Sequence, residues 1–192
     1  MPIIQEDAEE KFLKIAADAD KFEGYEPGAH AARIAVLADA LAIKLGLGAH
    51  DRFLLRQAAL VHDIGEMAMN RDYIKANRAL GGDERIDMQR HTVVGEQEAA
   101  KLGLNRAVAL FVRWHHEWWN GAGYPDAISR EQIPLAARIL RVADCFTALT
   151  NERPYRAAVS TAEAKTYLTE WVGIEFDPKV VKLFLTLEEF SE

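Results

Sequence analysis

The residues of this sequence that could do chemistry are histidines that stand next to carboxylates or next to one another. His62 and Asp63 are adjacent at the end of an apolar helical segment, and His115 and His116 are adjacent just before a glycine-rich loop. An imidazole offers a neutral nitrogen to a metal ion, and a carboxylate can bridge two ions through its two oxygens. Both pairs come where a core-facing helix is expected to end, which indicates a buried metal site.

Two further segments carry candidate ligands. Glu26 and His30 are four residues apart, which is one helical turn, so we expect both side chains to face the core. Either both residues are metal ligands, or they form a Glu–His hydrogen bond that caps a helix. His91 has polar neighbours and, taken alone, is either structural or on the surface.

Asp144 lies inside the apolar sequence RILRVADCFTAL, where a buried carboxylate needs a cation or a partner. A salt bridge to Arg138 or Arg141 is the alternative to a metal. The single cysteine, Cys145, excludes a structural zinc site built from thiolates. His50 is expected on the surface. Without His50, the candidate histidines and acids still offer more nitrogen and oxygen donors than one tetrahedral zinc ion uses. This number favours two or three octahedral ions such as iron or manganese.

The elements that must position these residues are helices, because the apolar residues recur mostly at helical spacing. An all-α fold is therefore predicted. Ser160 with Glu163 forms a capping box before one helix, and Asp177 with Pro178 begins the last. The other helices are expected at about 5–21, 27–45, 50–62, 86–101, 105–117 and 134–150, with 134–150 in the centre of the fold. The helix at 50–62 is expected to stop at Gly65, where a loop begins.

Composition limits the class of protein and of partner. A chain of 192 residues with 49% hydrophobic content fits one domain spanning 1–192. A net charge of −7 makes duplex nucleic acid an unfavourable partner. No stretch approaches the roughly 18 apolar residues that a membrane span requires, and the N-terminal segment is acidic. We therefore expect a soluble cytoplasmic protein that does not bind membranes.

The motifs, taken in order, resemble the HD-GYP branch of the HD phosphohydrolases. The matching segments are HAARIAVLADALA, AALVHDIGE, the lone His91, HHEWWNGAGYP and RILRVADCFTALTNERPYR, followed by FDPKVV in the closing helix. They span 26–156, with the C-terminal helices at 160–190. The resemblance implies a helical bundle around a bi- or trinuclear centre of iron or manganese. Its implied ligands are Glu26, His30, His62, Asp63, His91, His115, His116 and Asp144, and Glu26 is the acid that goes with trinuclear members.

The resemblance also implies a mechanism and a substrate site. A metal-bridging water attacks phosphorus, with Asp63 and His62 as the catalytic pair. Arg153 and Arg156 correspond to positions that contact substrate phosphate, and the alternative for them is a helix-end salt bridge. The family's signature loop, Gly123-Tyr124-Pro125, contributes Tyr124 to the substrate site and is associated with docking a diguanylate cyclase-type partner. The alternative for this loop is a rigid turn.

Four positions depart from the family pattern. Glu66 stands in the substrate site where the family usually has lysine, Trp118 replaces arginine, and Asn120 and Thr147 replace aspartates. Because these changes alter the surroundings of the ligands, three functions stay open. They are a phosphodiesterase that hydrolyses cyclic di-GMP to the linear dinucleotide or GMP, a phosphohydrolase for another cyclic dinucleotide or nucleotide, and a catalytically weak metal-bound signalling or docking domain.

The chain also leaves its own association open. Trp171 and Phe190 are large apolar side chains near the C-terminal end of the sequence. They either pack in a homodimer or fill the core of a single chain.

Overall fold

The computed structural model describes residues 3–27, 29–76, 78–152 and 156–187, with side chains from residue 10 onward. Its described residues are helical except for loops and isolated β-bridge residues, among them the pair Val172 and Phe176, which confirms the predicted all-α class. The helices are α1 Ile3–Glu23, α2 Ala31–Lys44, α3 Ala49–Val61, α4 Ile64–Met69, α5 Gly82–Met88, α6 His91–Lys101, α7 Arg106–Trp114, α8 Leu135–Thr150, α9 Thr161–Glu170 and α10 Pro178–Phe184, with a 3₁₀ turn at Arg130–Gln132.

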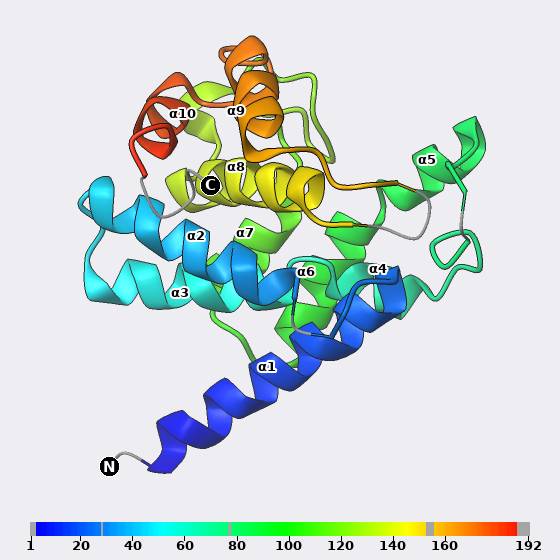
Figure 1. Ribbon diagram of the computed structural model, residues 1–192. Helices are drawn as coiled ribbons and strands as arrows, with labels where there is room; N and C mark the ends of the chain where they lie inside the picture. The colour runs from blue at the N-terminus through cyan, green and yellow to red at the C-terminus, as the bar shows by residue number, and fades with distance from the viewer. Residues whose placement is uncertain (1–2, 28, 77, 153–155, 188–192) are drawn as a thin grey trace.

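The core forms where α2, α3 and α8 pack together, with α7 beside α3 and α10 against α2 and α8 (Figure 1). The apolar stripe of α2 is fully buried at Ile34 and Leu41, and α3 contributes Leu55. Most of α8 is buried, as its almost continuous apolar sequence predicts. The ends of α3 and α7, which carry His62 and His115, therefore meet the middle of α8, which carries Asp144, inside one hydrophobic core.

α1 and α5 lie at the periphery of this core. The C-terminal half of α1 packs against α3 and α4, whereas its N-terminal half extends away from the body of the molecule (Figure 1). The short α5 lies on the far side of α4 and α6 from α2 and α3 (Figure 1). No described helix combines the length and apolarity needed to cross a membrane.

The helices α4 and α6 cross in close contact near the candidate ligands. A Cβ atom added at Gly65 in α4 would lie 2.0 Å from the carbonyl oxygen of His91 and 2.7 Å from the amide nitrogen of Gly95. Only a residue without a side chain permits this approach. The prediction that Gly65 ends a helix and begins a loop is wrong, because this glycine lies inside α4 and allows α6 to pack on it.

Local capping signals place the N-termini of the last two helices, α9 and α10. Ser160 accepts a hydrogen bond from the amide of Glu163 at 3.2 Å, and the side chain of Asp177 accepts one from Lys179 at 2.7 Å. Both predicted N-termini are thereby confirmed. The single helix expected at 86–101 is instead two helices, α5 and α6, which are separated by a turn just before His91.

Candidate metal centre

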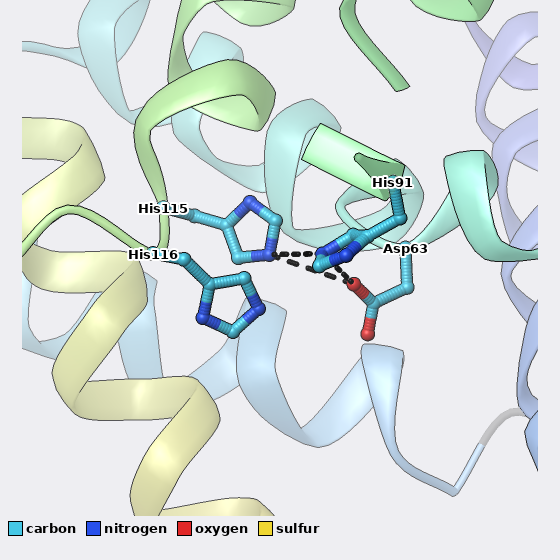
Figure 2. A group of neighbouring side chains, drawn as sticks. All are labelled: Asp63, His91, His115 and His116. Atoms are coloured by element: carbon cyan, nitrogen blue, oxygen red, sulfur yellow. Dashed lines mark hydrogen bonds and ion pairs between the residues drawn. The ribbon is translucent and has the colours of Figure 1, made fainter. Parts of the chain in front are cut away.

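Asp63 lies at the centre of a cluster of histidines that come from four parts of the chain. It is the residue just before α4, and its two carboxylate oxygens face different histidines. One oxygen, Oδ2, is 2.9 Å from Nε2 of His62, and the other, Oδ1, is 3.4 Å from Nε2 of His91 and 3.5 Å from Nε2 of His115. Figure 2 shows the imidazoles of His91 and His115 turned toward this carboxylate, with His116 beside His115. This is the geometry of a carboxylate that can bridge two cations.

Three of the imidazoles have their orientation fixed by the backbone. His62, His91 and His115 each place Nδ1 against the carbonyl oxygen three residues earlier, at 2.9, 2.7 and 2.6 Å respectively. Because a carbonyl can only accept, each Nδ1 must carry a proton, and in the neutral form of each imidazole Nε2 is left with its lone pair. All three Nε2 atoms point into the cluster, and those of His91 and His115 are only 3.5 Å apart. A metal ion would satisfy nitrogens held in this way.

The ligand-competent atoms form three overlapping groups among the described residues. The first contains Asp63, His91, His115 and His116, the second His30, His62 and Asp144, and the third Glu23, His30 and Asp63. In the second group, Nε2 of His30 lies 3.6 Å from Oδ1 of Asp144. Since Asp63 and His30 each belong to more than one set of neighbours, the groups form a continuous site suited to more than one ion.

Glu26 is not brought to this site. Its side chain is exposed, and the carboxylate beside His30 and Asp63 belongs to Glu23, which is 7% exposed. The expectation that Glu26 faces the core is wrong because α2 begins at Ala31 rather than near Pro27. Without a continuous helix, a spacing of four residues does not place Glu26 and His30 on one face. Glu23, the last residue of α1, was not singled out by the sequence.

Buried polar atoms that lack a hydrogen bond indicate whether these residues fit a metal ion. Among the buried side-chain atoms without a hydrogen bond in the described structure are both ring nitrogens of His30, Nε2 of His62 and Oδ1 of Asp63. Buried polar atoms are normally paired, and leaving them unpaired is costly. These atoms all belong to the groups above. The donor set, which consists of imidazole nitrogens and carboxylate oxygens, fits divalent iron, manganese or zinc.

The histidines of the cluster differ in pKa because their electrostatic surroundings differ. Burial opposes the charged form of His62, but the carboxylates of Asp63, Asp144 and Glu23 outweigh it and raise the pKa of His62 to about 10. Burial lowers the pKa of His91 to about 4, and burial together with His115 and Arg141 holds the pKa of His116 well below its ordinary value. His91 and His116 are therefore neutral imidazoles at pH 7, as metal ligands must be.

Arg141 borders the cluster as a buried cation. It donates to Nδ1 of His116 at 2.8 Å and to Asp144 at 3.4 Å, and its other terminal nitrogen pairs with the buried carboxylate of Glu175. Of the two arginines named as partners for Asp144, Arg141 makes the contact, whereas Arg138 pairs with Asp177 at 2.5 Å. The salt bridge and the metal site are thus not exclusive, because Asp144 takes part in both arrangements.

The glycine-rich loop packs directly on His116. A Cβ atom at Gly123 would meet the amide nitrogen of Trp118 at 2.2 Å and the carbonyl oxygen of His116 at 2.5 Å, so glycine is needed for close approach. The ring of Tyr124 then stacks on His116 with 4.9 Å between centroids. Glu117, which is 2% exposed, accepts from the amide of Asp126 at 2.6 Å and ties the loop to the end of α7. Sequence reasoning did not assign Glu117 a role.

The remaining site candidates fall in different places. Glu66 is buried, whereas Arg156 is exposed and donates to the carbonyl oxygen of Ala148 near the end of α8, so the structure does not bring it to the cluster. Arg153 lies outside the described residues. Thr147 is buried in α8, Asn120 is exposed, and Trp118 packs edge-on against Trp171. His50 is exposed, as predicted.

Comparison with known proteins gives one family and several relatives. The family model described as "HD domain" matches residues 15–180. The 3′3′-cGAMP-specific phosphodiesterase 3 of Vibrio cholerae is 36% identical over 150 residues, which are 78% of this chain and 33% of that protein. The cyclic di-GMP phosphodiesterase response regulator RpfG of Xanthomonas campestris is 35% identical over 183 residues, 94% of this chain and 48% of that protein. This chain spans about a third to a half of the length of these curated relatives.

Solved structures share the fold. The crystal structure of a cyclic GMP-AMP specific phosphodiesterase of V. cholerae superposes with a TM-score of 0.71 at 22% identity, over 94% of this chain and 48% of that one. The HD domain of the phosphodiesterase PgpH of Listeria monocytogenes gives a TM-score of 0.61 at 16% identity, over 94% of this chain and 99% of that one. At these identities the likeness concerns the fold.

Proposed function

Because this chain belongs to the HD-domain family, we propose that it is a metal-dependent phosphodiesterase that hydrolyses a cyclic dinucleotide. The resemblance to the HD-GYP branch is confirmed among its relatives. The observation that carries the proposal is the position of Asp63, whose two oxygens face His62 on one side and His91 and His115 on the other. We infer that Asp63 would hold metal ions together with His62, His91 and His115, and that Glu23, His30 and Asp144 would supply the further ligands of the site.

The residues around this centre have separable roles in such a reaction. Divalent ions held here would acidify a water for in-line attack on phosphorus and screen the charge of the phosphate oxygens. The buried imidazoles of His91 and His115 would hold their ion in one position, because the backbone fixes the orientation of both rings through Nδ1. Burial raises the pKa of the Tyr124 hydroxyl, so it stays a neutral phenol that can donate to a phosphate oxygen.

For the substrate we infer cyclic di-GMP, converted to the linear dinucleotide or GMP. The cyclic di-GMP phosphodiesterases among the relatives support this, and RpfG covers 94% of this chain. A specific observation also favours 3′3′-cGAMP as a second candidate, because two relatives named for that substrate are 36% and 30% identical to this chain. Iron or manganese remains our inference for the metal, from the number of nitrogen and oxygen donors.

The hypothesis that the chain is a catalytically weak docking domain is less well supported. Gly123 and Tyr124 contact the segment that carries His116, which favours a role of this loop in holding the site. Docking of a diguanylate cyclase-type partner through the loop stays a prediction, as does a homodimer. A pure docking module has no physical need for buried imidazoles whose nitrogens converge on one carboxylate.

The test is metal content and hydrolysis measured on the same anaerobically purified protein. Metal per chain is determined by elemental analysis, and turnover of cyclic di-GMP and 3′3′-cGAMP is followed with and without added iron or manganese. Asp63→Ala removes the central carboxylate. Asp51→Ala, a matched change at an exposed acid in the first turn of α3, is the control.

We expect about two or three ions per chain, with turnover lost in Asp63→Ala and kept in Asp51→Ala. Metal-loaded protein that hydrolyses neither substrate would favour another nucleotide or the docking role. Protein that stays metal-free and inactive after reconstitution would contradict the ligand assignment itself.

A further inference from the structure

A pocket of about 240 Å³ lies beside the metal centre, between the end of α1, α4 and the segment that leads into α5. Its lining includes Glu23, which also belongs to the ligand group with His30 and Asp63. The pocket therefore begins at the metal centre. Pockets that hold a whole drug-sized ligand typically measure roughly 300–1,000 Å³, so this one suits a single part of a dinucleotide, such as one base.

The wall of the pocket that is formed by the segment before α5 and by α5 itself is held in place by ion pairs and hydrogen bonds. Arg78 makes a two-pronged contact with Glu84 at 2.7 and 2.6 Å, and Glu84 also accepts from the amide of Gly81 at 2.8 Å. The hydroxyl of Tyr73 donates to Asp87 at 2.9 Å. These contacts join the segment before α5 to α5 itself, so the ring of Tyr73 is a positioned surface on which a base can stack.

Glu66 supplies the polar edge of the pocket. It is 7% exposed, lines the pocket with Glu23, and lies in none of the ligand groups found among the described residues. A carboxylate next to phosphate would be repulsive, which argues against the phosphate contact made by the lysine usual at this position. A carboxylate is, however, a strong acceptor for N–H groups.

We propose that this pocket receives a guanine base of the cyclic dinucleotide and that Glu66 accepts hydrogen bonds from its N1–H and its 2-amino group. The inference rests on the proposed function and adds base selectivity to it. Guanine presents two adjacent donors to one carboxylate, whereas adenine presents one donor beside an unprotonated ring nitrogen that a carboxylate repels. Hydrogen bonds to the pairing edge together with aromatic stacking are the usual way in which proteins recognise an unpaired base.

The lining of the pocket also contains a cation. Arg85 lines it, is exposed, and uses only Nε in its described hydrogen bond, to the carbonyl oxygen of Leu80 at 3.2 Å. Its terminal nitrogens can reach an acceptor on the ligand, such as O6 of guanine. The pocket thus offers both an acceptor and a donor for the pairing edge of a base, which matches guanine better than adenine.

The experiment measures kcat/KM of the metal-loaded enzyme for cyclic di-GMP, cyclic di-IMP and cyclic di-AMP in direct competition. Inosine keeps N1–H and lacks the 2-amino group, so it separates the two hydrogen bonds. The enzyme carries either the native residue or Glu66→Gln. The control is Glu98→Gln, the same chemical change in an acid that pairs with Lys101 on α6. Metal per chain is measured for every variant.

We expect kcat/KM to fall in the order cyclic di-GMP, cyclic di-IMP, cyclic di-AMP. The values for the first and the last substrate should differ by at least about a hundredfold. Glu66→Gln should lower the ratio of cyclic di-GMP to cyclic di-AMP by about tenfold or more, as loss of hydrogen bonds to a charged group predicts, while Glu98→Gln leaves it unchanged. The ratio is insensitive to a general loss of fold or activity.

Three outcomes would overturn the proposal. An equal loss on every substrate in Glu66→Gln would show that Glu66 does not recognise the base. A loss of bound metal with an unchanged ratio would place Glu66 at the metal centre. Preference of the native enzyme for cyclic di-AMP would exclude a guanine pocket while leaving the phosphodiesterase function in place. If no cyclic dinucleotide is hydrolysed, the proposed function itself fails.

Discussion

The two halves of the metal centre are held in different ways. In the half formed by α4, α6 and α7, His91 and His115 have Nδ1 fixed on backbone carbonyls and face Asp63. In the half next to α1 and α2, His30 has no hydrogen bond to either ring nitrogen among the described residues, and its ring is held by stacking on Tyr25 at 4.1 Å between centroids. The first half is oriented before any ion binds, whereas in the second half His62 is fixed on the carbonyl oxygen of Ala59 and the orientation of His30 depends more on the ion.

The backbone of the second half is nonetheless well placed. The buried carboxylate of Asp20 accepts from the amides of His30 and Ala31 at 3.0 and 3.2 Å, which caps the N-terminus of α2 from the end of α1. The cap fixes the position of His30 but not the rotation of its imidazole. We therefore expect the half with His91 and His115 to bind its ion more tightly than the half with His30.

The largest expected effect comes from Gly65, which brings α4 against α6 and so places Asp63 opposite His91. Gly65→Ala would drive a methyl group to 2.0 Å from the carbonyl oxygen of His91, and the helices would have to separate. We expect a loss of about 3 kcal/mol in the free energy of unfolding, the upper part of the range for overpacking, together with weaker metal binding. Urea unfolding and metal titration measure the two effects.

The control for Gly65→Ala is Gly82→Ala in the first turn of α5, where a Cβ atom would meet nothing within 4 Å. Alanine there should be neutral or stabilising by up to about 1 kcal/mol. If both variants unfold at the same urea concentration as the native protein, the helix crossing does not organise the first half of the site.

The second largest effect is expected when one histidine is removed from each half of the metal centre in turn. His91→Ala removes an oriented ligand, and we expect it to lose at least about one ion per chain and nearly all turnover. His30→Ala should keep the ion between Asp63, His91 and His115 and lose only the one beside Asp144. Elemental analysis of both variants, with circular dichroism to show that each is folded, measures this. Loss of all metal from His30→Ala with retention in His91→Ala would reverse the comparison.

Sequence reasoning succeeded where a short-range rule decides the structure. Ser160 and Asp177 were placed as helix caps because a side chain that accepts from an amide two or three residues later is a local interaction. The all-α fold and the histidine pairs at helix ends followed from periodicity. The meeting of His62, His91 and His115 could not be worked out from spacing, since it depends on how α3, α6 and α7 pack. The family resemblance supplied that step.

The errors concern contacts between distant segments. Gly65 was taken as a helix end because glycine commonly ends helices, but here it serves a close approach to α6, which no local pattern reveals. Glu26 was placed beside His30 by assuming one continuous helix, whereas the chain bends before Ala31 and Glu23 takes that position. Glu23 lies among many acids on α1, so composition gave no reason to choose it.

A smaller effect distinguishes these two acids. Glu23→Gln keeps the shape of the side chain and removes its charge, so we expect about tenfold weaker binding of the ion next to His30, as for a lost contact to a charged group. Glu26→Gln changes an exposed side chain and should alter the affinity by less than about twofold. Calorimetric titration with manganese measures both. A larger effect at Glu26 would mean that the α1–α2 connection rearranges when metal binds.

The smallest effect concerns the outer support of the first half. Asp126 holds the glycine-rich loop on α7 through Arg113, at 2.6 and 2.7 Å, and through the indole N–H of Trp114 at 2.7 Å. The hydrogen bond from Arg113 is the main cause that lowers the pKa of Asp126 from 3.8 to about 2. Because the folded pKa lies below the unfolded one, this contribution to stability is complete above about pH 4 and is lost as the pH falls to about 2.

Asp126→Asn tests this support. The variant should be less stable than the native protein by under about 1 kcal/mol at pH 6, since the pair is partly exposed, and the difference should shrink as the pH falls from about 4 toward 2. Urea unfolding at pH 6, 4 and 3 measures it, with Asp51→Asn on α3 as the control. A difference that stays constant with pH would mean that Asp126 stabilises the loop through shape rather than charge, and the support of His116 would then rest on Gly123 and Glu117.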